Sequence, residues 1–255
     1  MVNLHQEDCA SLAQGFECRF CRILGYLNLH LLPLFSKGNL VYLKRFCIFG
    51  VGNKDNLITI NETMKTIVYF HGYGSSCRSN SATCLAKNLP EYNVIAPDIP
   101  VDPKEALPFL KNYCAENKVD LIIGTSMGGM YAMQMTDYPR ICVNPALHMS
   151  QKKDILQVGT FERFQPTADG QTHFTITEEI IQHFKDMEQH LFDGITSENQ
   201  SLCRGFFADG DTLVNCKDEF AQHFTHVEDF HGEHRMNEQV IRNVIIPAAI
   251  RILTE

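Results

Sequence analysis

Short apolar runs alternate with stretches of helix-forming residues from residue 64 to the end of the chain. The apolar runs are rich in β-branched residues, which predicts buried strands, and the stretches between them predict helices. The predicted strands cover residues 66–70, 93–96, 121–123, 140–143, 202–208 and 226–230. The predicted helices cover residues 81–88, 103–116, 130–135, 178–191 and 236–253, the last bent at Pro247. This alternation predicts an α/β fold with a mostly parallel central sheet and helices on both faces.

Residues 150–200 interrupt the alternation. Within them, Thr177 is a predicted N-cap for an amphipathic helix over residues 178–191, because apolar side chains recur on one of its faces. Such a helix either covers the sheet like the others or belongs to a short cap segment above a functional site. The sequence leaves both interpretations open.

The composition changes near residue 63. Residues 1–63 hold six Lys or Arg and five Asp or Glu, whereas the remaining 192 residues hold 16 and 25. We therefore expect an N-terminal extension of uncertain order over residues 1–63 and the functional domain over residues 64–255, with residues 150–200 as its small cap. The first 60 residues could also be translated sequence upstream of the natural start, or a hairpin at the sheet edge with a strand at residues 40–49.

Charge and hydropathy exclude several classes of protein. The net charge of −8 argues against a nucleic-acid surface. The longest apolar region, residues 23–35, is interrupted by polar residues and too short to span a bilayer, so we expect no membrane span. The ten cysteines are scattered, which is typical of reduced thiols in a cytoplasmic protein, and the lone pair Cys18 and Cys21 predicts no metal site.

A five-residue motif, Gly124-Thr125-Ser126-Met127-Gly128, lies between a predicted strand and a predicted helix. This order is the setting of a nucleophile elbow, in which a strained turn holds the serine hydroxyl above the sheet. Glycines at both ends of the motif allow the backbone segments to approach closely. The alternative is a glycine-rich turn with an incidental serine.

A nucleophilic serine needs a histidine to accept its proton and an acid to orient that histidine. In the α/β-hydrolase order, both partners follow the serine in the chain, just after the last strands. The sequence offers Asp209 and Asp211 after one strand, and His231 and His234 after the next. We favour Asp211 and His234, because each lies beyond a glycine in a loop that can reach back toward Ser126.

The loop after the first strand of the sheet begins with His71 and Gly72. An oxyanion hole takes one backbone N–H from the residue after the nucleophile and one from this loop. The predicted donors are therefore the N–H groups of Met127 and Tyr73. We expect structural roles for His71 and for Asp98.

The motifs from residue 64 onward resemble those of the small YqiA/YcfP-like esterases of the α/β-hydrolase superfamily. The similar segments are IVYFHGYGSS at 67–76, VIAPDIP at 94–100, GTSMGGMYA at 124–132, NPA at 144–146, GDTLVN at 210–215 and GEHRM at 232–236. The resemblance implies a triad of Ser126, Asp211 and His234, in agreement with the order argument. It also implies a cytoplasmic esterase or thioesterase that binds no cofactor. Residues 1–63 have no counterpart in it.

The leading hypothesis is a serine hydrolase that cleaves carboxylic esters or thioesters through an acyl-enzyme on Ser126. Its partner would be a small-molecule ester or thioester, and the sequence does not predict an oligomeric state. A hydrolase-fold binding protein without turnover is one alternative. A peptidase or acyltransferase that uses the same triad is another, because the elbow chemistry is shared among these classes.

Overall fold

The computed structural model describes residues 48–49, 58–59 and 64–255, and the chain divides into two units, residues 1–62 and 63–255. In the first unit, Ile48–Phe49 (β1) pairs antiparallel with Ile58–Thr59 (β2). Of the strand predicted at residues 40–49, only residues 48–49 are described. The pair Cys18 and Cys21 lies outside the described residues. The assignment of residues 1–63 to an N-terminal extension stays a prediction.

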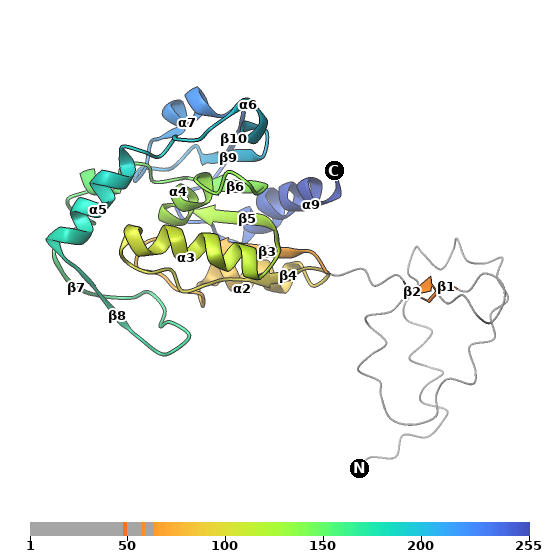
Figure 1. The fold of residues 1–255 in the computed structure, drawn as a ribbon, viewed down its shortest axis with the longest axis horizontal. Helices are drawn as coiled ribbons and strands as arrows, with labels where there is room; N and C mark the ends of the chain where they lie inside the picture. The colour runs from red at the N-terminus through yellow and green to blue at the C-terminus, as the bar shows by residue number, and fades with distance from the viewer. Residues whose placement is uncertain (1–47, 50–57, 60–63) are drawn as a thin grey trace, which may run out of the picture. The chain divides into compact units, whose positions relative to one another are not determined.

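A six-stranded, wholly parallel sheet forms the centre of the second unit, in the order β10-β9-β6-β5-β3-β4 (Figure 1). Its strands are Thr66–Phe70 (β3), Asn93–Ile95 (β4), Val119–Thr125 (β5), Arg140–Val143 (β6), Cys203–Ala208 (β9) and His226–Phe230 (β10). All six were predicted from the apolar runs. The parallel sheet confirms the predicted fold class.

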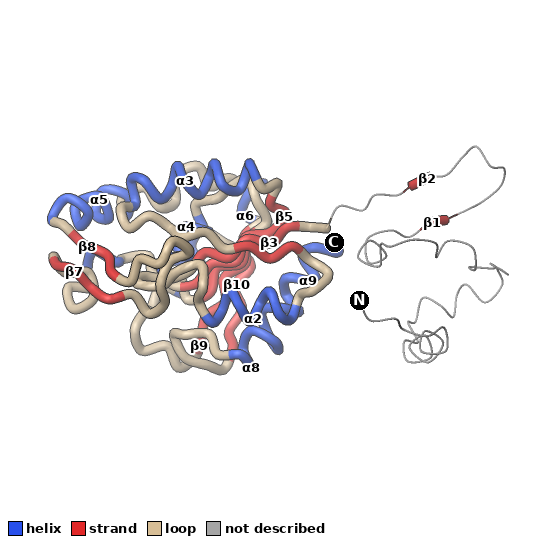
Figure 2. Tube along the Cα trace, turned by 90° about the horizontal axis from the view of Figure 1, so that it is seen from below, coloured by secondary structure: helices blue, strands red, loops and turns tan. Residues whose placement is uncertain are grey.

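Helices cover both faces of this sheet, and each face has its own apolar core. On β3, Val68 and Phe70 pack toward one face, while Ile67 and Tyr69 pack toward the other. Figure 2 shows α3 and α5 on one side of the strands and α2, α8 and α9 on the opposite side. The helices are Asn80–Asn88 (α2), Pro103–Glu116 (α3), Met127–Met133 (α4), Lys217–His223 (α7), Glu238–Val240 (α8) and Ile246–Thr254 (α9).

The terminal helix differs from the prediction of one long helix that starts at residue 236. The side chain of Asn237 caps it by accepting a hydrogen bond from the Val240 N–H, so α8 begins at Glu238. A π-helical segment, Ile241–Ile245, then separates α8 from α9. Pro247 explains this interruption, because it has no N–H for the carbonyl four residues earlier and its ring crowds that carbonyl. None of the helices in the described part of the chain is long and apolar enough to cross a membrane.

Residues 150–200 contain an antiparallel hairpin that was not predicted. Its strands, Gly159–Glu162 (β7) and His173–Ile176 (β8), follow the 3₁₀ turn Met149–Gln151 and precede Glu178–Glu188 (α5) and Ser197–Gln200 (α6). Each strand has only four residues, and β7 buries no side chain fully, so the apolar pattern is weak. The predicted cap of α5 is present, with Thr177 Oγ1 accepting from the Ile180 N–H.

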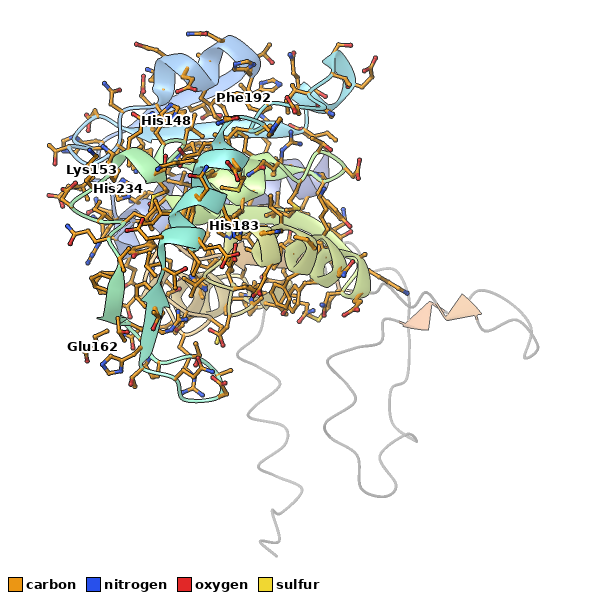
Figure 3. The ribbon with its side chains drawn as sticks, turned by 60° about the vertical axis from the view of Figure 1, so that its left-hand side comes forward. His148, Lys153, Glu162, His183, Phe192 and His234 are labelled. Carbon is orange, nitrogen blue, oxygen red and sulfur yellow. The ribbon has the colours of Figure 1, made fainter. Side chains whose placement is uncertain are left out.

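Hydrogen bonds fix this segment to the sheet domain, among them those of α5 and of the hairpin loop. His183 on α5 contacts the carboxylate of Asp102, the N-cap of α3, at 2.9 Å (Figure 3). The loop of the hairpin, residues 163–172, binds the loop that follows β3. There the Phe164 N–H donates to Gly74 O at 2.9 Å, and the Arg163 guanidinium donates to Ser75 O at 2.9 Å. These hydrogen bonds hold the hairpin loop directly against the loop after β3.

A shortened chain that starts at Met64 tests whether the second unit folds alone. The unit has a core on each sheet face, and its first strand begins at Thr66 with every residue buried. We expect the shortened chain to unfold cooperatively, with a thermal midpoint close to that of the full chain. Circular dichroism and calorimetry on both chains provide the comparison, and an insoluble or molten product would show that the first 63 residues are needed for folding.

Candidate active site

The turn at Ser126 joins β5 to α4 with a strained backbone. Ser126 has φ 54° and ψ −121°, a conformation that costs a non-glycine residue on the order of 1–3 kcal/mol. The strain persists because both sides of the turn are tightly packed. A Cβ atom on Gly124 would lie 2.2 Å from Gly128 O, and one on Gly128 would lie 2.1 Å from Phe70 O. Both positions thus require glycine, and Ser126 is held at the carboxyl edge of the sheet.

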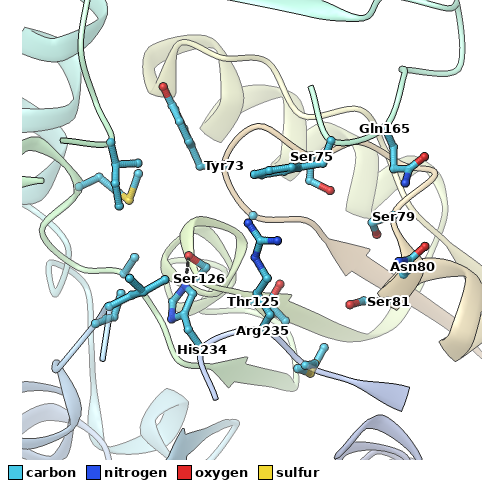
Figure 4. Close-up of a pocket in the computed structure, with 18 of the residues that line it drawn as sticks. Tyr73, Ser75, Ser79, Asn80, Ser81, Thr125, Ser126, Gln165, His234 and Arg235 are labelled. Atoms are coloured by element: carbon cyan, nitrogen blue, oxygen red, sulfur yellow. Dashed lines mark hydrogen bonds between the residues drawn. The ribbon is translucent and has the colours of Figure 1, made fainter. Parts of the chain in front are cut away.

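Ser126, His234 and Asp211 form a continuous chain of contacts. Ser126 Oγ lies 2.9 Å from His234 Nε2 (Figure 4), and His234 Nδ1 lies 2.7 Å from Asp211 Oδ2. The other carboxylate oxygen of Asp211 accepts the backbone N–H groups of Leu213 and Val214. The side chains of His234 and Asp211 are 14% and 5% exposed. The three residues come from loops after β5, β9 and β10, whose carboxyl ends lie at one edge of the parallel sheet.

The competing residues Asp209 and His231 form a separate pair. His231 Nδ1 lies 3.1 Å from Asp209 Oδ2, and the Gly232 N–H donates to Asp209 Oδ1. The hydrogen bond from His231 holds the pKa of Asp209 below its ordinary value. The two side chains are 98% and 56% exposed for His231 and Asp209 respectively. Within the described residues, this pair has no hydrogen bond to Ser126.

The predicted oxyanion donors lie on either side of Ser126. Tyr73 and Ser126 line the same cavity of about 380 Å³, and the position of a Cβ on Gly72 would be 3.4 Å from Ser126 Cβ. Met127 is the first residue of α4, where a backbone N–H has no acceptor within the helix. Neither the Tyr73 nor the Met127 N–H donates to another residue in the described part of the chain. Both groups are therefore available to a ligand atom.

His71 and Asp98 hold the loops around the cavity. His71 is 2% exposed, with Nδ1 placed 2.9 Å from Gly72 O and Nε2 accepting the Ile99 N–H at 3.1 Å. Burial lowers the pKa of His71 to about 4, so the ring is neutral at pH 7. Asp98 accepts the N–H groups of Cys77 and Ala168; burial opposes ionisation, but these donors hold the pKa of Asp98 below its ordinary value. These contacts support the structural roles expected for both residues.

Asn144 is a residue of the site whose contacts the sequence did not reveal. It is 2% exposed and has a positive φ of 44°, directly after β6. Its Nδ2 donates to the carbonyls of Glu233 and His234, at 3.3 and 3.1 Å, while Oδ1 accepts the Ala208 N–H at 2.8 Å. The amide thereby connects the end of β9 to the loop that carries His234. Its sequence signals were its position at a strand end and its place in the NPA segment at 144–146.

The described residues include no group of three or more His, Cys, Asp and Glu side chains arranged to hold a metal ion. Ser126 Oγ contacts the His234 ring, and this ring contacts Asp211. The chemistry that this arrangement supports is proton transfer to and from a serine hydroxyl.

Comparison with known proteins identifies the family. The model of an uncharacterised protein family, UPF0227, matches residues 66–238, which include Ser126, Asp211 and His234. The chain belongs to this family. The match confirms the resemblance to the YqiA/YcfP-like esterases and hence an enzyme family of the α/β-hydrolase type.

Solved structures with the same fold include several hydrolases. Est1E from Butyrivibrio proteoclasticus aligns with a TM-score of 0.52 at 10% identity, over 76% of this chain and 90% of its own. The monoacylglycerol lipase of Paleococcus ferrophilus aligns with a TM-score of 0.54 at 11% identity, over 74% and 94%. The mouse alpha/beta hydrolase domain-containing protein 10 aligns with 0.54 at 12%, over 82% and 98%. At these identities the likeness shows the α/β-hydrolase fold.

The buried neutral ring of His71 predicts that stability depends on pH. The unfolded chain takes up a proton on His71 near pH 6.5, whereas the folded protein does so only near pH 4. Protonation in this interval favours unfolding, so this contribution is intact above pH 6.5 and is lost as the pH falls. We expect a loss of about 3 kcal/mol in the free energy of unfolding between pH 6.5 and 4 from this group.

Denaturant titrations of the wild type and of His71→Gln across this pH range measure the effect. The variant should show a flatter pH dependence, and His226→Gln, at an exposed position on β10, should keep the wild-type dependence. Parallel curves for the wild type and His71→Gln would contradict the prediction.

The contacts of Asn144 predict that its amide keeps His234 in register with Ser126. Asn144→Gly tolerates the positive φ but removes the hydrogen bonds to Glu233 O and His234 O. We expect kcat for an activated ester to fall by about tenfold or more, with little change in KM, because the amide does not line the cavity. Steady-state kinetics, with thermal unfolding as the control for folding, test this, and an unchanged kcat in a folded variant would refute it.

Proposed function

We propose that the protein is a serine hydrolase that cleaves carboxylic esters or thioesters through an acyl-enzyme on Ser126. The observation that carries this proposal is the continuous contact from Ser126 Oγ through the His234 ring to Asp211. Membership of an esterase family supports ester hydrolysis in general terms. The proposed mechanism uses side chains and backbone N–H groups of this chain and requires no cofactor.

In the first half-reaction, Ser126 Oγ attacks the carbonyl carbon of the substrate and its proton passes to His234 Nε2. Asp211 accepts the hydrogen bond from Nδ1–H, which keeps Nε2 free to act as the base and stabilises the imidazolium that forms. The carbonyl oxygen becomes an oxyanion, held by the N–H groups of Tyr73 and Met127. When the tetrahedral intermediate collapses, the leaving oxygen or sulfur takes the proton from Nε2 and departs as an alcohol or thiol.

In the second half-reaction, a water molecule replaces the leaving group. His234 Nε2 takes one of its protons while the oxygen attacks the acyl carbon. The same two N–H groups hold the second oxyanion, and the proton on Nε2 returns to Ser126 Oγ as the acid is released. The cavity of about 380 Å³ beside Ser126 gives room for a small ester, and its side chains include Met149, Ile155, Leu213 and Val214.

The cytoplasmic location stays a prediction, which rests on the ten scattered cysteines of the sequence and on the family resemblance.

A fluorophosphonate probe, a Ser126 variant and two matched pairs of His and Asp variants test the proposed mechanism. The probe should label Ser126 in the wild type, and Ser126→Ala should abolish labelling and lower kcat by on the order of 10⁴ or more. His234→Ala and Asp211→Asn should be severe, the latter because an amide favours the wrong ring tautomer. The exposed pair provides the controls: His231→Ala and Asp209→Asn make the same chemical changes on the same two loops.

The outcome of this experiment separates the alternatives. Turnover of p-nitrophenyl butyrate that disappears in the buried-pair variants and persists in the exposed-pair variants supports the proposal. Probe labelling without turnover of esters, thioesters or peptides would indicate a binding protein, and preferential cleavage of peptides or transfer to an added alcohol would indicate the other classes. A collapse in His231→Ala with activity retained in His234→Ala would reverse the assignment.

A further inference from the structure

The cavity beside Ser126 has two chemically different walls. One wall comes from residues 146–155 and 213–214, where the Lys152 ammonium donates to Leu213 O and the other side chains are largely apolar. The second wall comes from the loop after β3, the start of α2, the end of β5 and the hairpin loop. It presents the hydroxyl and amide side chains of Ser75, Ser79, Asn80, Ser81, Thr125 and Gln165 (Figure 4).

Arg235 belongs to the polar wall. In Figure 4 its guanidinium extends between Ser126 and the group Ser79, Asn80 and Ser81. The guanidinium carbon lies 4.5 Å from the centre of the Phe164 ring, which the hairpin loop supplies. Stacking on an aromatic face holds the guanidinium plane and leaves the N–H groups at its edge free to bind a ligand. The hydrogen bond from the Phe164 N–H to Gly74 O fixes the platform on the loop after β3.

The charges around the cavity have one sign. Lys152, Arg235 and the His234 ring are the ionisable basic groups that line it, and no Asp or Glu lines it, although the chain carries a net charge of −8. Among the described residues, the arginines that pair with a carboxylate are Arg204 and Arg242. Arg235 therefore has no carboxylate partner among the described residues, and a bound anion would meet no carboxylate in the cavity wall.

We infer that the substrate carries an anionic group, a carboxylate or a phosphate, in the part that lies along the polar wall, and that Arg235 binds it. This inference rests on the proposed ester hydrolysis at Ser126 and specifies its substrate class. The fork of the guanidinium matches both anions, because each offers two oxygens to parallel N–H donors. The hydroxyl and amide groups that line the same wall offer further hydrogen-bond donors to that anion, and the apolar wall accommodates the rest of the molecule.

Two pairs of esters that differ in one anionic group test the inference. Mono-p-nitrophenyl succinate and p-nitrophenyl butyrate have four-carbon acyl groups and differ in a terminal carboxylate. 1-Butyrylglycerol 3-phosphate and 1-butyrylglycerol differ in a phosphate on the leaving group. We expect wild-type kcat/KM to favour the anionic member of at least one pair, and Arg235→Gln to lower kcat/KM for that member by about tenfold while changing the neutral member by less than about twofold.

Three further variants sharpen the result. Arg235→Lys should restore part of the preference, because it keeps the charge without the fork. Arg251→Gln makes the same charge change on α9, near the opposite edge of the sheet, and should leave the preference intact. A preference lost in Lys152→Gln but kept in Arg235→Gln would overturn the assignment to Arg235. Added salt should weaken the preference in the wild type.

The inference fails independently of the proposed function. Equal losses for the neutral and anionic esters in Arg235→Gln, or no preference for an anion in either pair, would overturn it while hydrolysis at Ser126 stood. If the wild type cleaved none of the four esters, binding would still test the anion site. Calorimetry on Ser126→Ala would then compare the binding of monoethyl succinate with that of ethyl butyrate. Binding of monoethyl succinate that is lost with Arg235→Gln supports the anion site, and equal or absent binding of the two overturns it.

Discussion

The close crossing of two glycines around Ser126 is the constraint on which the site depends. Gly124, the residue before the last of β5, lies against Gly128 in the first turn of α4, and Gly128 lies against the carbonyl of Phe70 on β3. Because both glycines lack a side chain, α4 can pack closely against β5 and β3. The strained residue between them, Ser126, then presents its hydroxyl at the edge of the sheet. The strands β3 and β6 pair with β5 on either side, which fixes their distances from Ser126. The positions of Tyr73, in the loop after β3, and of Asn144, directly after β6, follow from this pairing.

The fold was largely predictable because the six sheet strands are short apolar runs separated by recognisable helices. Two parts were not. In the hairpin of β7 and β8, only Phe174 and Ile176 of β8 are buried in the core, and β7 buries no side chain fully. Two apolar positions in a four-residue strand are too short a pattern to predict a strand. The π-helical segment before Pro247 follows from a missing N–H, and a proline inside a helical pattern indicates an interruption without specifying its form.

The candidate site was predictable to the level of residue types and order along the chain. The motif around Ser126 and the strand-end positions of the Asp and His residues were visible, since parallel strands bring their carboxyl ends to one edge. The contacts of Asn144 were not, because they depend on a positive φ and on two strands that are distant in sequence. Arg235 was visible as a residue beside His234, but its platform comes from Phe164 in the hairpin that the sequence did not reveal.

The two Asp–His pairs show what separates an oriented histidine from an ordinary surface pair. Backbone hydrogen bonds from Asp209 to Phe230 and from Gly210 to Gly232 extend the ladder between β9 and β10, so Asp209 and His231 stand side by side at an exposed strand end. At Asp211 the chain turns back, with its N–H donating to Ala208 O, and the side chain passes beneath the loop that carries His234. There two backbone N–H groups hold one carboxylate oxygen while the other faces the ring, in a place from which water is largely excluded. A hydrogen bond in such surroundings competes with little water, and it holds the ring with Nε2 2.9 Å from Ser126 Oγ. The exposed ring of His231 has no hydrogen bond to Ser126 among the described residues.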